Sequence, residues 1–112
     1  MPKRVLDEEK VKRAFVDEQT AKVKRVLQKE HGIDCLLLLL IGKGRWGDAN
    51  KFIRENNAVM SDNTFRNRMR EFENVGLAES SLINGDRSKR QWTSTENGKK
   101  FAKRLLEVFM KA

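Results

Sequence analysis

Three arginines and three asparagines lie among regularly spaced apolar residues between Ser61 and Ser80. In the major groove of DNA an asparagine can pair bidentately with adenine, and an arginine with guanine. If this stretch is a helix with Phe65 at the centre of its apolar side, 100° per residue defines the opposite side. That opposite side would carry Asn63, Asn67, Arg70 and Asn74, with Thr64 and Arg66 beside it.

This polar side has two interpretations. A solvated face is the simpler one, because every surface helix has a polar side. DNA contact is the interpretation we favour, because of the hairpin that follows in the sequence. In a helix–turn–helix the N-terminal part of the second helix reaches the base edges. We therefore predict base contacts from Asn63, Arg66 and Asn67, and contacts nearer the phosphates from Ser61, Thr64 and Arg70.

The hairpin is predicted from two segments with strand character, Leu77–Ile83 and Arg90–Ser94. The residues between them, NGDRSK, are typical of a turn. In a winged domain such a tip can reach the minor groove or adjacent phosphates. An ordinary soluble hairpin is the alternative, since basic residues also keep strand edges from pairing with other chains. The candidate contacts are Arg87, Lys89 and Arg90, with weaker candidates at Lys43 and Arg45 before the second helix.

Helices are predicted on both sides of these two elements. The first 30 residues look helical, with a break near Thr20, and Gly32 is expected to end that segment. Ile33–Ile41 fits a buried strand or a buried helix, and its five leucines favour a helix. A short helix is expected from Trp46 or Gly47 to about Glu55, followed by a turn at NNAVM.

Polar residues mark the starts of the last two helices. Ser61 is a good N-cap, and Asp62 in the first turn suits the positive end of the helix dipole. Phe65, Met69 and Phe72 then form one apolar stripe, and Gly76 closes the helix. Thr95 caps a final helix, in which the aligned apolar residues are Phe101, Leu105, Val108 and Phe109.

The resulting order is four helices, a strand, a turn, a strand and a helix. This predicts a mainly α fold with a small β-hairpin (α+β), because three compact helices followed by a hairpin outline a winged helix–turn–helix. We expect a helical extension over residues 1–32, the winged helix–turn–helix over residues 33–94, and a C-terminal helix over residues 95–112 that packs on the domain or on a dimer partner.

From Cys35 onward the sequence resembles winged helix–turn–helix transcriptional regulators of the HxlR and MarR type. Those families carry S-x-x-T-L-x-x-x-L-x-x-L-E-x-x-G-L over the recognition helix. The residues that match this pattern in register are Ser61, Thr64, Phe65, Met69, Phe72, Glu73, Gly76 and Leu77. Thr95 and Gly98 match the L-T-x-x-G at the last helix, and Arg45-Trp46 resembles the R-F that opens the second helix.

The resemblance implies a DNA-binding transcriptional regulator. Its recognition helix, residues 61–75, would enter the major groove, and its hairpin wing, residues 84–90, would lie on the minor groove or the backbone. The sequence departs from the families at Ala49, at Ser94 and in the longer turn before Ser61. Cys35 does not match the cysteine of HxlR regulators, so a redox or aldehyde-sensing role is not implied.

The composition agrees with an anionic partner. The 112 residues include 24 Lys and Arg against 16 Asp and Glu, a net charge of +8. This favours nucleic acid first and a membrane surface second. Residues 61–90 hold six basic and five acidic side chains, so binding depends on which face the charges occupy. The longest apolar run, Ile33–Ile41, is far shorter than the roughly 20 residues that span a bilayer. Without a signal-peptide pattern, a cytoplasmic, nucleoid-associated protein is expected.

Catalytic and metal chemistry have little support. His31 and Cys35 are spaced i, i+4, but no second histidine or cysteine completes a metal site. Cys35 lies beside five leucines, so we expect a buried structural thiol. The stretch GKGRWG lacks the following Lys-Ser/Thr of a phosphate-binding loop. We therefore predict a protein that is not an enzyme, with no cofactor and no metal.

The terminal helices suggest a homodimer. Their apolar residues need burial, and a partner chain could supply it, setting two recognition helices about 34 Å apart. The alternative is that both helices fold back on their own domain. Two other functions stay open: a sequence-neutral, chromatin-type DNA binder, and a winged helix that docks another protein through its asparagine-rich face. The apolar residues of the terminal helices that need burial are Phe15, Leu27, Phe101, Leu105, Val108 and Phe109.

Overall fold

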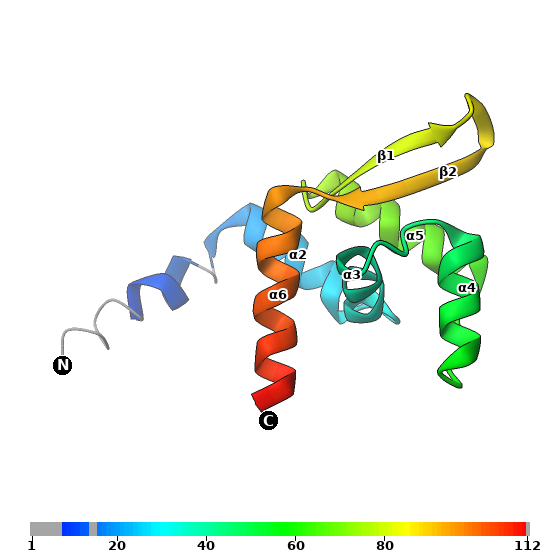
Figure 1. The fold of residues 1–112 in the computed structure, drawn as a ribbon. Helices are drawn as coiled ribbons and strands as arrows, with labels where there is room; N and C mark the ends of the chain where they lie inside the picture. Colours follow the sequence, from blue (N-terminus) through cyan, green and yellow to red (C-terminus); the bar gives the residue numbers. More distant parts are fainter. Residues whose placement is uncertain (1–7, 14–15, 112) are drawn as a thin grey trace.

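The computed structural model describes residues 8–13 and 16–111, apart from the side chains of residues 87 and 88. Residues 8–13 are helical, and the labelled elements follow in the predicted order (Figure 1). The prediction of a mainly α fold with one antiparallel hairpin is confirmed. The elements are α2 (Glu18–Gln28), α3 (Gly32–Leu40), α4 (Trp46–Glu55), α5 (Asp62–Asn74), β1 (Ala78–Ile83), β2 (Asp86–Ser94) and α6 (Glu96–Lys111).

Helix α3 lies at the centre of the core and contacts α2, α5, α6 and β2. This explains its sequence, because a helix surrounded by other elements is apolar on most sides. Ile33–Ile41 is thus helical over most of its length, as its leucines favoured. From α5 the apolar stripe of Phe65, Met69 and Phe72 packs fully buried into the same core. None of the helices that the structure describes is both long and apolar enough to cross a membrane.

Gly32 begins α3, so the expectation that it ends the first helical segment is wrong. Helix α2 ends at Gln28, and His31 takes the left-handed conformation, with φ of 60°. A Cβ on residue 32 would lie 2.1 Å from the backbone oxygen of Val26. Glycine is therefore needed here because two helices approach closely.

The break expected near Thr20 lies at Asp17, three residues earlier. Asp17 is the N-cap of α2, and its carboxylate accepts hydrogen bonds from the backbone nitrogen of Thr20 at 2.8 Å and its hydroxyl at 2.7 Å. These two bonds lower the pKa of Asp17. An aspartate cap of this kind satisfies backbone donors that a helix start leaves unpaired.

The boundaries of α5 agree with the sequence. The Ser61 hydroxyl accepts a hydrogen bond from the backbone nitrogen of Thr64 at 3.1 Å, which is the expected N-cap. Gly76, with φ of 81°, ends the helix in the left-handed conformation. The Thr95 hydroxyl donates to the Gly76 oxygen at 2.8 Å and accepts from the Gly98 nitrogen at 3.1 Å. Thr95 thereby caps α6 and ties its start to the end of α5.

The hairpin has a shorter turn than predicted. Strand β2 begins at Asp86, and only Asn84 and Gly85 form the turn, with φ of 54° and 73°. Positive φ at both positions is the type I′ geometry that suits the twist of two paired strands. The pairing runs regularly from Ala78↔Ser94 to Leu82↔Arg90 and then shifts to Ile83↔Asp86. Figure 1 shows the hairpin projecting above the helices.

Helix α6 is buried along its first half only. Phe101 and Leu105 pack against the core, as the sequence suggested. Val108 and Phe109 continue the same apolar side but are exposed, at 62% and 48%. Figure 1 shows the C-terminal end of α6 standing at the lower edge of the molecule. Within one chain, therefore, the expected burial of these two residues does not occur. The position of Phe15 lies outside the described residues.

Candidate nucleic-acid interface

The outer side of α5 is as the helical spacing predicted. Asn63, Arg70 and Asn74 are exposed, and Asn67 is half-buried. They lie opposite the apolar stripe that holds the helix in the core. Arg66 and Thr64, also half-buried, flank this side. The structure thus brings together the asparagine and arginine side chains that were selected on α5.

Some of the selected side chains are already engaged. Arg66 Nε is 2.6 Å from Asp62 Oδ1, an i, i+4 ion pair in the first turn of the helix. The Ser61 hydroxyl donates to Thr64 Oγ1 at 2.9 Å in addition to its capping bond. Any contact of Arg66 with a base would therefore require it to exchange or share its Asp62 partner.

One flank of α5 is fixed to the N-terminal helical region. Glu71 accepts hydrogen bonds from Lys29 and Arg68, and Arg68 Nε also donates to the Glu30 oxygen at 2.9 Å. Partial burial of Glu71 raises the pKa of its carboxyl, but the hydrogen bonds from Lys29 and Arg68 outweigh burial and hold the pKa below its ordinary value. Sequence reasoning missed this cluster. Its one local signal was the i, i+3 spacing of Arg68 and Glu71 near the apolar stripe.

The other flank of α5 is fixed to the hairpin. Glu73 accepts hydrogen bonds from the Trp92 indole at 3.1 Å and from the Ser80 hydroxyl at 2.9 Å. Ser80 Oγ in turn accepts from Arg90 Nη1 at 2.9 Å. Trp92 also packs edge-on against Phe65. Helix α5 and the hairpin therefore share one hydrogen-bond network.

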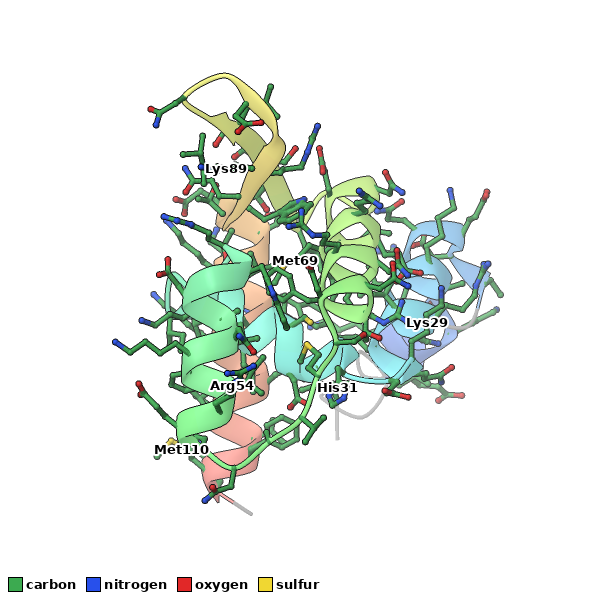
Figure 2. All side chains as sticks on the ribbon, turned by 90° about the vertical axis from the view of Figure 1, so that its right-hand side faces the viewer. Lys29, His31, Arg54, Met69, Lys89 and Met110 are labelled. Atoms are coloured by element: carbon green, nitrogen blue, oxygen red, sulfur yellow. The ribbon has the colours of Figure 1, made fainter. Side chains whose placement is uncertain are left out.

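The basic residues predicted at the hairpin tip are distributed differently. Arg90 pairs with Leu82, so it begins the regularly paired part of β2 as the sequence predicted, and its side chain joins the network of Glu73 through Ser80. Lys89 is exposed on β2 and is labelled in Figure 2. The side chain of Arg87 lies outside the described residues. Arg45 forms an isolated bridge with Gln91, which pairs with Ser81 along the hairpin, and half-buried Lys43 lies two residues before Arg45.

His31 and Cys35 do not face a common site. Cys35 is fully buried, as predicted, with Sγ 3.7 Å from Met60 Sδ. Burial, with a smaller contribution from Asp34, raises the pKa of the Cys35 thiol to about 12. His31 Nδ1 lies 3.0 Å from Asp34 Oδ2. Across the part of the chain that the structure describes, no three His, Cys, Asp or Glu side chains are grouped to hold a metal.

An apolar groove of about 300 Å³ opens on another side of the molecule. It lies between α3, α4, the loop after α4 and the second half of α6. Leu37, Ile41, Phe52, Val59 and Leu106 line it. Together with the exposed Val108, Phe109 and Met110 at the end of α6, it leaves apolar surface uncovered in the described chain.

Comparison with known proteins supports the fold. No known family model matches this chain, and no curated protein matches its sequence. Among solved structures, the fold is similar to a crystal structure of an S. aureus MepR–DNA complex. The TM-score is 0.57 and the identity 17%, over 96% of this chain and 82% of the MepR chain. At this identity the similarity establishes the fold, a winged helix–turn–helix, and confirms that prediction.

Proposed function

We propose that this protein is a DNA-binding transcriptional regulator in which α5 enters the major groove. The observation that carries the proposal is that the sides of α5 differ: the flanks are bound to other elements, and the outer side, among the described residues, is not. Two of its three acids, Glu71 and Glu73, are turned to the two flanks and held there by hydrogen bonds, and the third, Asp62, pairs with Arg66 in the first turn. On its outer side, Asn63 and Arg70 are exposed and Asn67 is half-buried, so they can contact a partner. These are residue types that read base edges and bind phosphates.

The roles of individual residues follow from their positions. Asn63, Arg66 and Asn67 lie in the N-terminal half of α5, which reaches the bases in a helix–turn–helix. Ser61, Thr64 and Arg70 lie nearer the phosphates. Because the fold resembles that of MepR in its DNA complex, the hairpin is the wing. It would contribute Arg87, Lys89 and Arg90 to the minor groove or the backbone.

The motifs shared with HxlR and MarR regulators support a regulatory role. Such a regulator would act in the cytoplasm on the nucleoid, without a cofactor or an enzymatic activity. We further propose a homodimer, because α6 presents Val108, Phe109 and Met110 to solvent. Two-fold symmetry would then set two recognition helices about one turn of DNA apart.

Selection from random-sequence duplex DNA at two salt concentrations tests the function. A dimeric regulator should enrich a palindromic motif with half-sites one helical turn apart. Salt-sensitive binding without enrichment would indicate a sequence-neutral, chromatin-type binder. Failure to bind at low salt would falsify the DNA proposal and favour a protein-docking role for the asparagine-rich face.

The variant Asn67→Ala tests the assignment of the recognition helix. Losing a bidentate contact to adenine should cost about 1–3 kcal/mol of discrimination at one position of each half-site. The selected motif should therefore become degenerate at that position while the rest is kept. Lys103→Gln, an exposed change on α6, is the control and should leave the motif intact. An unchanged motif in Asn67→Ala would remove this residue from the base contacts.

A further inference from the structure

One side of α2 carries a row of basic residues beside α5. Lys22 and Arg25 lie at i and i+3 of α2, and Lys29, its C-cap residue, follows at i+7, so the three lie on one side at and just after the helix. The row is anchored at its end, where Lys29 donates a hydrogen bond to Glu71 of α5. At the other end of α2, Gln19 Nε2 donates to the Val75 oxygen, just after α5, at 2.8 Å. Figure 2 shows Lys29 next to α5. Helix α2 is therefore fastened to the C-terminal part of α5, at Glu71 and Val75.

Helix α2 and the hairpin occupy opposite flanks of α5. Glu71, which holds α2, and Glu73, which holds the hairpin, are two residues apart and so point about 200° apart around the helix. The outer side with Asn67 and Arg70 lies between them. DNA placed against that outer side, with the hairpin on one edge, would meet α2 on the other edge.

Lys22, Arg25 and Lys29 differ in the carboxylate partners that they have in the structure. The ammonium group of Lys29 is bound to Glu71 and serves as the anchor. Lys22 Nζ lies 3.6 Å from Glu18 Oε1, and both side chains are largely exposed, so this pair is weak. Arg25 is exposed, and within the described residues no carboxylate pairs with it. Arg25, with its guanidinium fork open to solvent, is thus the residue best prepared for a phosphate.

From this geometry we propose that Arg25, assisted by Lys22, binds backbone phosphates at the edge of the groove that α5 occupies. The inference rests on the proposed function and extends its interface from two elements to three: the hairpin, α5 and α2. Helix α2 then has two tasks. It holds the recognition helix through Lys29 and Gln19, and it binds the DNA backbone through Arg25.

The dependence of DNA affinity on salt concentration tests the proposal. Each phosphate contact contributes about 0.9 to the slope of log affinity against log salt. For Arg25→Gln we therefore expect a slope smaller by about one and an affinity about five- to tenfold lower at 0.1 M salt. The selected sequence motif should stay the same, because a phosphate contact carries no sequence information. Glu18→Gln should tighten binding, since it releases Lys22 and removes a negative charge.

Lys103→Gln is the matched control, because it removes the same charge from an exposed site on α6, which lies behind α4 in Figure 2. It should leave the slope unchanged. If Arg25→Gln behaves like this control while the parent protein binds DNA with a salt-dependent affinity, the inference is overturned and the proposed function stands. If the parent protein does not bind duplex DNA at all, both fail.

Discussion

At the scale of single residues, the carboxylate of Glu71 shows how helix α5 is held. Its folded-state pKa lies below the ordinary value of 4.5 because Lys29 and Arg68 stabilise the charged form more than burial opposes it. A depressed pKa means that this carboxylate contributes stability above the unfolded-state pKa. That contribution is lost as the pH falls through the folded-state pKa.

The variant Glu71→Gln should lower the free energy of unfolding by about 1 kcal/mol at pH 7, since charge-assisted hydrogen bonds are replaced by neutral ones at a partly exposed site. The difference from the parent should begin to shrink as the pH falls below about 4.5, where the unfolded chain binds a proton at Glu71, and should vanish below the folded-state pKa, where the native carboxylate is protonated too. Urea unfolding over a pH series measures both effects. Glu107→Gln, an exposed change on α6, is the control. Equal stabilities of Glu71→Gln and parent at pH 7 would contradict this role.

The residues that could be predicted from the sequence are those whose roles depend on local spacing. The outer side of α5 follows from a period of 3.6 residues around Phe65, and the cap at Ser61 follows from its residue type. Arg68 could not be found in this way. Its partner at Glu30 lies 38 residues away along the chain, and Lys29 lies 42 residues from Glu71. Helical periodicity carries no information about contacts between distant segments.

At the scale of elements, Gly32 determines how closely α2 and α3 approach. A Cβ at this position would overlap the backbone of Val26 and Leu27, which cannot move away as a flexible side chain can. Gly32→Ala should therefore lower the free energy of unfolding by about 2–3 kcal/mol. Gly47→Ala is the matched control. Its Cβ would meet nothing within 4 Å, so alanine in α4 should stabilise by up to about 0.5–1 kcal/mol. Denaturant unfolding compares the two, and a tolerated Gly32→Ala would refute the close approach.

Two segments were harder to predict because their residue types fit more than one kind of secondary structure. The run from Ile33 to Ile41 has no polar residue except Asp34 and Cys35 to set a period, so only its leucines separated helix from strand. In the hairpin, six consecutive residues, 84–89, are of types that favour a turn. The observed turn has only two residues, because Asn84 and Gly85 accept positive φ. The rest of that segment joins β2. Lys89 was therefore expected in the turn and lies in β2, where the register shifts between the Leu82↔Arg90 and Ile83↔Asp86 pairs.

At the scale of the whole molecule, the exposed end of α6 lies on the same side as the apolar groove lined by Leu106. The apolar side of α6 continues past the part that the core covers, and Val108, Phe109 and Met110 remain exposed. Surfaces of this kind commonly mark contacts with another protein. In a two-fold dimer each such residue is buried twice, so a substitution there acts on both halves of the interface.

Phe109→Glu therefore tests the homodimer. Burying a phenylalanine side chain contributes roughly 1.5–3 kcal/mol, and symmetry doubles it, so the dimer dissociation constant should rise at least about 100-fold. Sedimentation equilibrium should give twice the chain mass of 13.0 kDa for the parent and the chain mass for the variant. Lys100→Gln makes the same change of charge on the polar side of α6 and should stay dimeric. A monomeric parent would overturn the dimer, whereas a dimeric Phe109→Glu would move its interface away from α6.

If the dimer forms through α6, Phe109→Glu should also lose its preference for paired half-sites while keeping the half-site sequence, because α5 itself is unchanged.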